Sequence, residues 1–384
     1  MKFFHLSDLH LGITVCGASM REEQIDILQK IVALCEEERP DALLISGDIY
    51  DKSAPSGAAF HLLDRFLTDL RARSIPVLLI SGNHDSADRL SYGADLLRDS
   101  GIFLTRPFEQ AGVEPPVTLT DSHGPVHFYQ LPYVRPATVR AAYPDEAERI
   151  GSSYPEAVKV ALEHMEVDPE ERNVLLAHQF VTGATPSDSK DLVVGGLDAI
   201  GGSLFDDFTY VALGHIHGPQ KVGRETMRYS GTPLKYSFSE VNQTKSVPVV
   251  TLGAPGTEPE IRLLPLTPLR DLRVRKGSYD EIMDRNNYAG TNTDDYVKII
   301  LTDEHDIPDC MNKLRSVYPN VLQLQYDNLR TRTSGEVGAA EHVKQKTPLE
   351  LFEELFEKQN GTRMSDAQRN LVRPLMEGVW KEEP

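Results

Sequence analysis

The stretch of sequence that decides the fold is Lys2-Phe3-Phe4-His5-Leu6-Ser7-Asp8-Leu9-His10. A short apolar run ends here in two side chains of the kind that bind metals, and this arrangement returns along the chain. The apolar run 42–46 is followed by Gly47-Asp48, and the run 75–81 is followed by Gly82-Asn83-His84-Asp85. In open α/β sheets, ligands gather at the carboxyl ends of strands. We therefore expect these segments to converge on one place.

Segments with helical periodicity separate these apolar runs. Residues 19–38 and 56–71 carry apolar side chains at helical spacing. Further strands are expected at 126–131, 173–177, 210–213, 227–230 and 247–252. Continuous apolar strands between amphipathic helices indicate an α/β fold whose sheet is covered on both faces. The periodicity alone favours a single open sheet.

Two later strands supply more of these side chains. His178 follows the run 173–177, and His215 and His217 follow 210–213. Residues two apart, such as Asp8 and His10, point to the same side of an extended chain. Carboxylates, imidazoles and one amide, without a thiolate, suit Mn²⁺, Fe²⁺ or Zn²⁺ better than Ca²⁺ or a structural zinc site.

The number of candidate ligands exceeds four, which predicts two ions with Asp48 as the bridge between them. Two ions about 3.5–4 Å apart polarise a phosphate, generate a hydroxide and stabilise the leaving oxygen. Each motif alone has a plainer explanation: Asn83 and Asp85 in a backbone-bonded turn, or His178 as a packed core histidine. Their joint occurrence at strand ends favours the metal site.

Taken together, Asp8-Leu9-His10, Gly47-Asp48, Gly82-Asn83-His84-Asp85, His178 and Gly214-His215-Ile216-His217 resemble the calcineurin-like metallophosphoesterase superfamily. The resemblance covers residues 1–265. It implies a β-sandwich flanked by helices with a di-metal site at one end, in place of the single open sheet.

Four longer stretches resemble the SbcD family of nuclease subunits within that superfamily. These are 5–12, 47–51, 82–86 and Tyr229-Ser230-Gly231-Thr232-Pro233-Leu234-Lys235-Tyr236-Ser237-Phe238-Ser239-Glu240. The resemblance implies a DNA phosphodiesterase that acts on DNA ends and hairpins as exonuclease and endonuclease. It implies a role in DNA repair, recombination and replication, two Mn²⁺ ions with Mg²⁺ as the other candidate, and the ATPase SbcC as partner. A homodimer inside a heterotetramer-type assembly is also expected.

The same resemblance assigns the site residues. One metal is expected at Asp8, His10, Asp48 and His217, and the other at Asp48, Asn83, His178 and His215. His84 is expected to reach the scissile phosphate, and Asp85 to orient His84 or, alternatively, to stabilise the turn. Some relatives carry a second histidine three residues after the bridging aspartate. Here that position is Asp51, which we expect to accept a hydrogen bond or to support the ligands.

The pattern restarts after residue 265. Strands at 271–276, 295–301 and 321–326 alternate with helices at 279–285 and 307–317, which predicts a βαβαβ capping domain over 266–330. Residues 331–346 are expected to be a linker, and 347–384 a segment of two helices (348–359 and 365–378) that docks on SbcC. Its apolar residues are Leu349, Phe352, Leu355, Phe356, Leu371 and Leu375. The alternative is a seam between these two helices.

The net charge argues against a broad basic surface for nucleic acid. The chain has 40 Lys+Arg and 58 Asp+Glu, a net charge of −18. Metal ions can still bring the backbone of DNA to the site. Candidate DNA contacts are Lys52, Arg89 and Arg106. The densest basic cluster is Arg270, Arg273, Arg275 and Lys276, in which Arg273 and Arg275 share one face of a strand.

The chain shows no signal-peptide core and no apolar stretch near the roughly 20 residues that cross a bilayer, so we expect a cytoplasmic protein without membrane contact. Two rival functions remain. One is a stand-alone metallophosphatase or cyclic-nucleotide phosphodiesterase, and the other is a scaffold that only docks the ATPase. The sequence leaves open the polarity of digestion, the exonuclease–endonuclease balance, the metal in the cell, the ATP gating mechanism and the stability of the free dimer.

Overall fold

The structure is a computed structural model that describes residues 1–185, 199–329, 331, 349, 352–353, 355–357 and 363–380, with side chains up to residue 373. It divides into two compact units, Met1–Leu272 and Arg273–Pro384.

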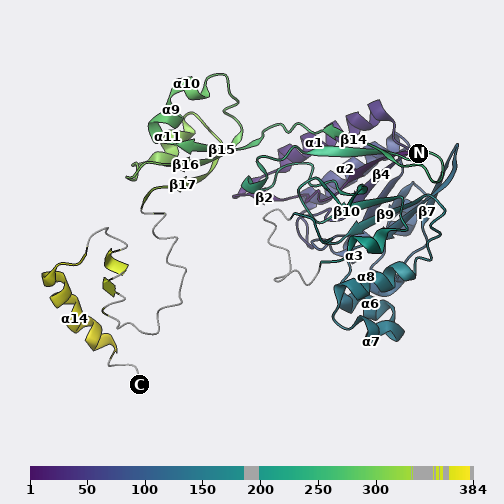
Figure 1. Ribbon diagram of the computed structural model, residues 1–384. Helices are drawn as coiled ribbons and strands as arrows, with labels where there is room; N and C mark the ends of the chain where they lie inside the picture. Colours follow the sequence, from purple (N-terminus) through teal and green to yellow (C-terminus); the bar gives the residue numbers. More distant parts are fainter. Residues whose placement is uncertain are drawn as a thin grey trace. The chain divides into compact units, whose positions relative to one another are not determined.

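The first unit is built on two sheets of six strands each (Figure 1). The first sheet has the order β14 (Glu260–Pro265), β13 (Ser246–Thr251), β1 (Lys2–Leu6), β4 (Ala42–Ser46), β5 (Val77–Ile80) and β6 (Ile102–Leu104). The second has the order β11 (Gln220–Val222), β12 (Arg224–Tyr229), β10 (Tyr210–Gly214), β9 (Asn173–His178), β8 (Gly124–Leu131) and β7 (Val117–Asp121).

The sheets face each other across a shared apolar core. Phe3 and Leu44 of the first sheet belong to the same buried cluster as Phe128, Leu176 and Tyr210 of the second. The Phe3 ring meets the rings of Phe128 and Tyr210 edge to face, with centroids 5.7 and 5.6 Å apart. Because side chains alternate along a strand, the neighbouring residues of β9 point to the opposite face. The two sheets therefore form a sandwich that is covered on both sides.

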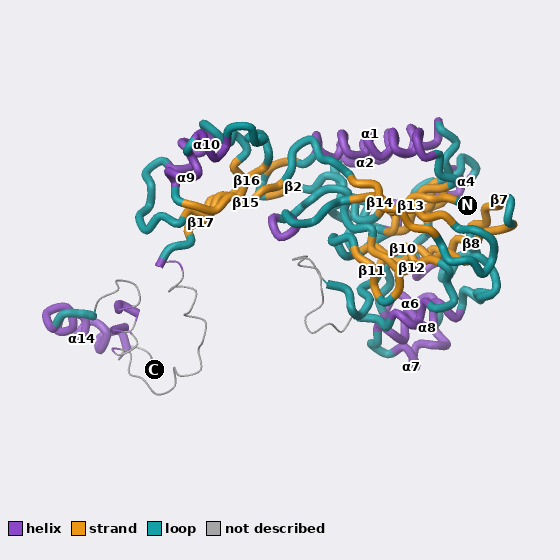
Figure 2. Tube along the Cα trace, turned by 45° about the horizontal axis from the view of Figure 1, so that its top comes forward, coloured by secondary structure: helices purple, strands orange, loops and turns teal. Residues whose placement is uncertain are grey.

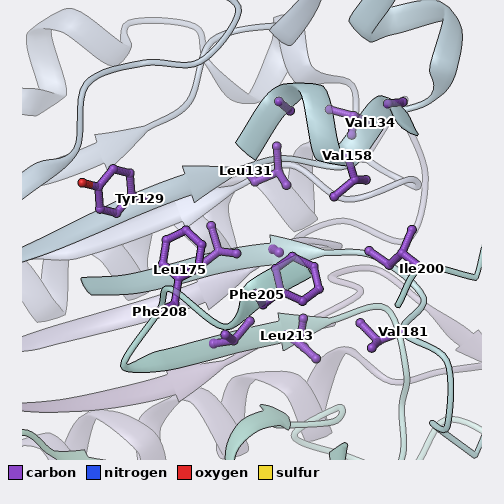
Figure 3. Packing of buried hydrophobic residues seen from close by; sticks show 14 of the residues in the cluster. Tyr129, Leu131, Val134, Val158, Leu175, Val181, Ile200, Phe205, Phe208 and Leu213 are labelled. Carbon is purple, nitrogen blue, oxygen red and sulfur yellow. The ribbon is translucent and has the colours of Figure 1, made fainter. Parts of the chain in front are cut away.

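Helices cover the outer faces. α1 (Arg21–Glu38) and α2 (Gly57–Ala72) connect β1 to β4 and β4 to β5, and they run side by side along the first sheet (Figure 2). Over the second sheet lie α6 (Pro136–Ala142), α7 (Ala147–Ile150) and α8 (Tyr154–Glu163). Figure 3 shows how Val158 packs with Leu131 and Leu175 in the cluster beneath these helices.

Short elements complete the first unit. They are β2 (Thr14–Val15), β3 (Ala18–Ser19), α3 (Ala87–Leu90), α4 (Ala94–Arg98), α5 (Phe108–Ala111), η1 (Pro144–Glu146), η2 (Gly202–Phe205) and η3 (Phe238–Glu240).

The sandwich confirms the fold that the family resemblance implied, and the single open sheet favoured by periodicity is wrong. Periodicity identifies a strand but not its partner: β1 pairs with β4 in parallel and with the distant β13 in antiparallel orientation. The edge strands β6, β7, β11 and β14 were not predicted, because they are short or largely exposed and carry few apolar residues in a row.

The second unit contains a sheet of three strands in the order β15 (Leu272–Gly277), β16 (Tyr296–Leu301) and β17 (Val321–Tyr326). Helices with described bounds in this unit include α9 (Tyr279–Met283), α10 (Arg285–Tyr288), α11 (Cys310–Arg315) and α14 (Asp366–Trp380). Ile299, Leu314 and Tyr318 are fully buried in its core. The strands and helices predicted for the capping region are present.

The units divide after Leu272 rather than after residue 265. Arg270 pairs with Glu22 and Glu23 on α1, and Lys235 pairs with Asp271. These contacts join residues 270–271 to the first unit. Among the described helices, none is long and apolar enough to span a membrane.

Candidate metal centre

Every side chain predicted to bind metal lies where a strand of the sandwich ends. β1, β4 and β5 are parallel neighbours in one sheet, as are β9 and β10 in the other. Their carboxyl ends meet at one edge, where the His215 amide donates to Asp8 Oδ1 at 3.0 Å. The polar residues at this edge are Asp8, His10, Asp48, Asn83, His84, His178, His215 and His217.

The first group, which we call site A, comprises Asp8, His10, Asp48 and His217. His10 Nε2 lies 3.2 Å from His217 Nε2 and 3.7 Å from Asp48 Oδ2. Asp8, His10 and His217 offer ligand atoms that all lie within 4.8 Å of one another. His10 Nδ1 is buried without a hydrogen-bond partner among the described residues. Converging imidazole nitrogens beside buried carboxylates fit a divalent cation.

The second group, which we call site B, comprises Asp48, Asn83, His178 and His215. Asn83 Oδ1 lies 2.9 Å from His215 Nδ1 and 3.1 Å from His178 Nε2. His178 Nδ1 donates to the carbonyl oxygen of Ser46 at 2.7 Å. Since a carbonyl oxygen only accepts, this bond leaves His178 Nε2 directed toward Asp48 Oδ2, 3.3 Å away.

Asp48 is common to both groups. Its Oδ2 atom is 3.7 Å from His10 Nε2 and 3.3 Å from His178 Nε2. Burial would raise the pKa of Asp48, but the neighbouring His178 and His10 hold it well below its usual range. The carboxylate is therefore ionised and lies beside histidines of both groups, so it could bridge two ions.

Burial and Asp48 divide the histidines into two kinds. Burial lowers the pKa of His178, but the Asp48 carboxylate outweighs it and raises the pKa to about 9. Burial lowers the pKa of His10 and of His215 to about 3. Neutral imidazoles keep a lone pair for a cation, and at His178 a cation competes with a proton for the same place beside Asp48.

His84 lies at the rim of the centre, with 23% of its side chain exposed. Its Nδ1 donates to the carbonyl oxygen of Asp51 at 3.0 Å, and its backbone N–H donates to Asp48 Oδ1 at 2.9 Å. Its ring lies edge-on to His10 with centroids 4.9 Å apart, and its Nε2 is 3.9 Å from Asp48 Oδ2. Asp51 thus contributes its backbone oxygen, which orients His84.

Asp85 connects the loop that follows β4 with the loop that follows β5. Its carboxylate accepts from the backbone N–H groups of Gly82 (2.9 Å), Ile49 (3.0 Å) and Tyr50 (2.9 Å). Burial and the nearby Asp48 raise the pKa of Asp85 to about 6. These contacts favour the turn-stabilising alternative for Asp85, with the Asp51 carbonyl taking the orienting contact to His84.

The backbone is strained at the ligands themselves. Asp8, His10, Asp48 and His215 have φ of 52°, 44°, 50° and 100°, in the region that L-residues rarely adopt. A Cβ on Gly214 would lie 1.9 Å from the Ser46 carbonyl oxygen, so only glycine fits there. Such strain clusters at functional sites, where the surrounding fold holds it in place.

Sequence reasoning missed the residues that support the ligands. Glu240 Oε1 lies 3.5 Å from His217 Nδ1, and Lys245 Nζ donates to the His217 carbonyl oxygen at 2.8 Å. Burial lowers the pKa of His217, but Glu240 outweighs it and raises the pKa above its usual value. Tyr133 stacks near His215, with ring centroids 6.2 Å apart. The one available signal was the stretch 229–240, which ends in Glu240.

Most of the basic residues considered for DNA contact have partners on the protein. Arg89 donates to the Ser53 carbonyl oxygen at 2.6 Å, and Arg106 pairs with Asp95 at 2.7 Å. On β15, Arg273 pairs with Asp295, Arg275 donates to Thr291 Oγ1 at 2.9 Å, and Lys276 pairs with Asp327 at 2.5 Å. Lys52 is exposed.

The docking segment is described in part. Leu349, Phe352, Leu355 and Phe356 are helical, and Leu355 and Leu371 are 45% and 68% exposed. The side chain of Leu375 and most of the expected linker 331–346 lie outside the described residues. Arg369 Nη2 donates to Glu353 Oε2 at 2.7 Å, which joins the two helical segments.

Comparison with known proteins identifies the family of this chain. The family model for calcineurin-like phosphoesterases matches residues 1–219. A second model, SbcD_C, which is described as the type 5 capsule protein repressor C-terminal domain, matches residues 268–360. A curated relative, the D subunit of the nuclease SbcCD of Staphylococcus epidermidis, is 31% identical over 387 residues and covers all of both chains.

Solved structures also match, at low similarity. A dimetal phosphatase from Danio rerio is 13% identical with a TM-score of 0.39, covering 70% of this chain and 99% of its own. A protein from Thermus thermophilus is 14% identical with a TM-score of 0.36, covering 64% of this chain and 92% of its own. On the family models and the full-length relative, the chain belongs to the SbcD family of calcineurin-like phosphoesterases.

Proposed function

We propose that the chain is the nuclease subunit of an SbcC–SbcD complex and that it hydrolyses DNA phosphodiesters with two metal ions. The observation that carries this proposal is the pairing of sites A and B around Asp48 at one edge of the sandwich. The full-length similarity to the D subunit of a nuclease SbcCD supports DNA as the substrate.

Site A would hold one ion and site B the other. The carboxylate, amide and imidazole donors, without thiolate, suit Mn²⁺, Fe²⁺ or Zn²⁺. The family resemblance selects Mn²⁺ among them, with Mg²⁺ as the second candidate. Two such ions polarise the phosphate, supply the nucleophile and stabilise the leaving oxygen. The protein contributes a fixed Asp48 between the sites and neutral imidazoles at His10 and His215.

We assign to His84 the role of donating a hydrogen bond or a proton to an oxygen of the reacting phosphate. The bond from its Nδ1 to the Asp51 carbonyl fixes the ring, so Nε2 is the nitrogen left for chemistry. A partly exposed imidazole at the rim can reach a substrate that the buried ligands cannot. When protonated, its Nε2–H can donate to a transferring oxygen or protonate the leaving one.

The acidic composition of the chain favours a partner that contributes much of the binding to DNA. A net charge of −18 leaves much of the grip on DNA to the ATPase subunit. The exposed Leu355 and Leu371 favour docking of the C-terminal helices on SbcC. A homodimer within a heterotetramer-type assembly is the arrangement that the family resemblance implies, and we propose it here. We place this assembly in the cytoplasm.

The test uses the purified chain with plasmid DNA, hairpin DNA and a small phosphodiester. Each substrate is offered Mn²⁺, Mg²⁺ or a chelator, with SbcC and ATP present in one arm and absent in the other. We expect Mn²⁺-dependent cleavage of DNA, at ends and at hairpins, which SbcC and ATP enhance. Hydrolysis of the small ester without DNA cleavage in either arm would instead identify a phosphatase or cyclic-nucleotide phosphodiesterase.

A further inference from the structure

A buried ion pair lies directly behind site A. Glu240 and Lys245 have side chains that are 0% and 4% exposed, and Lys245 Nζ lies 2.6 Å from Glu240 Oε2. Lys245 also donates to Thr232 Oγ1 and Gln243 Oε1, each at 2.7 Å. Taking two charges out of water costs several kcal/mol per ion before their attraction offsets it. The pair is therefore a costly arrangement, in which Lys245 is surrounded by acceptors while Glu240 Oε1 has no hydrogen-bond partner among the described residues.

The pair holds one ligand from two sides. Glu240 Oε1 faces His217 Nδ1 at 3.5 Å, and Lys245 Nζ donates to the carbonyl oxygen of the same residue at 2.8 Å. The Thr232 amide donates to that carbonyl oxygen as well, at 3.1 Å. With Nδ1 turned toward a carboxylate, His217 Nε2 is left facing His10. A carboxylate behind a ligating imidazole fixes its orientation and raises its basicity.

The rest of the 229–240 stretch reaches the other site A ligands. Ser230 Oγ lies 2.7 Å from Ser7 Oγ, and Ser7 donates to the Asp8 carboxylate. Tyr236 OH donates to the Leu9 carbonyl oxygen at 2.7 Å, next to His10. One segment, distant in sequence from β1, thus supports all three ligands that belong to site A alone.

Site B is supported differently. Its side-chain hydrogen bonds run from His178 to the Ser46 carbonyl oxygen and from His215 and His178 to Asn83. Tyr133, which follows β8, stacks beside His215, and the His215 amide donates to Asp8 Oδ1 of site A at 3.0 Å. The described hydrogen bonds and ion pairs of Glu240 and Lys245 therefore reach His217 and none of His178, His215 and Asn83, although the two sites share Asp48 and the bond from His215 to Asp8.

We infer that Glu240 and Lys245 are positioning residues that hold His217 in place and set the cation affinity of site A independently of site B. This inference rests on the proposed two-metal function, because it assigns His217 to one of the two ions.

The test is a calorimetric titration of Mn²⁺ into the metal-free full-length chain. The variants are Glu240→Gln, which keeps the size of the side chain and loses its charge, and the double variant Glu240→Gln/Lys245→Met. The double variant removes both charges together, so it leaves no unpaired buried ion if the single variant fails to fold. The matched control is Arg172→Met: Arg172 is 2% exposed and pairs with Asp121 at 2.7 Å, before β9 begins, at the end of the strand opposite to the metal centre.

We expect two ions per wild-type chain. In both Glu240 variants one ion should bind about 10- to 100-fold more weakly, which is the usual effect of losing such a supporting contact. The affinity for the other ion should be unchanged. Arg172→Met should lower the melting temperature and leave both affinities unchanged. Two unaltered affinities in the Glu240 variants, or equal weakening of both ions, would overturn the inference alone. A wild-type chain that binds no Mn²⁺ would overturn the proposed function as well.

Discussion

Sites A and B share one carboxylate but are built from the fold in different ways. Site B is held almost entirely by strand ends, through a backbone carbonyl oxygen at Ser46 and an amide at Asn83. Site A draws on a segment far from β1 in the sequence, with a buried ion pair behind His217. The comparison teaches that local motifs identify the candidate ligands, whereas the residues that hold a ligand in place can lie far away in the sequence.

The largest effect is expected where the two sites coincide. Asp48→Asn removes the charge that lies between His10 and His178, so both ions should be lost or greatly weakened. DNA cleavage should then fall by about 10³-fold or more, beyond the range typical of one lost electrostatic contact. Metal counting by elemental analysis, beside a cleavage assay, checks this. Retention of one tightly bound ion would show that Asp48 belongs to only one site.

His84→Gln should separate chemistry from metal binding. His84 lies outside both proposed ligand sets, so two ions should remain bound while cleavage falls by about 10²- to 10⁴-fold, the usual contribution of an acid–base group. Initial rates on hairpin DNA at saturating Mn²⁺ measure the loss. A variant as active as the wild type would refute the assignment of His84, and loss of one ion would make it a ligand.

The stability of the metal-free chain should depend on pH through site B. Asp48 raises the pKa of His178 from its ordinary 6.5 to about 9 in the folded chain. The stabilisation from protonated His178 is therefore fully present below pH 6.5 and is lost as the pH rises toward 9. Thermal melts across this range should show a falling melting temperature, and the slope should flatten in Asp48→Asn. An equal slope in both proteins would contradict the coupling.

A smaller effect, on the stability of the fold, is expected at Asp85. Asp85→Asn cannot accept all three backbone N–H bonds that join the β4 and β5 loops, so unfolding should become easier by about 1–3 kcal/mol. Urea denaturation measures this change. The control is Asp88→Asn, because Asp88 is exposed. Two-ion binding should survive at saturating Mn²⁺. An unchanged denaturation midpoint would remove Asp85 from the structural account.

The sequence predicted which polar side chains would converge, because each lies at or shortly after the end of an apolar run. Their division into two ligand sets came from the family resemblance and stays a prediction. The strands β1, β4, β5, β9 and β10 were identified from their uninterrupted apolar runs, and topology then brings their ends together. The pairing of β1 with β13 could not be predicted from periodicity, since it joins residues that periodicity treats separately. The supporting roles of Glu240 and Lys245 were not predicted for a related reason. A buried charged residue can be recognised only when the position of its partner is known.

The basic residues show the opposite outcome. Clustered arginines on β15 suggested a DNA surface, but Arg273 and Lys276 are engaged by Asp295 and Asp327 in the structure. Composition counts charges and does not show which of them are compensated. Contacts to DNA by these residues remain a proposal that depends on exchanging an internal carboxylate for phosphate.

The most direct test of the two-metal account follows bound Mn²⁺ and hairpin cleavage in one titration of the metal-free chain. Mn²⁺ is added in steps while the free ion is measured by electron paramagnetic resonance and cleavage by gel. The account predicts that cleavage stays low as the first ion binds and rises with the second. Full cleavage with one ion bound per chain, or no cleavage with two, would contradict it.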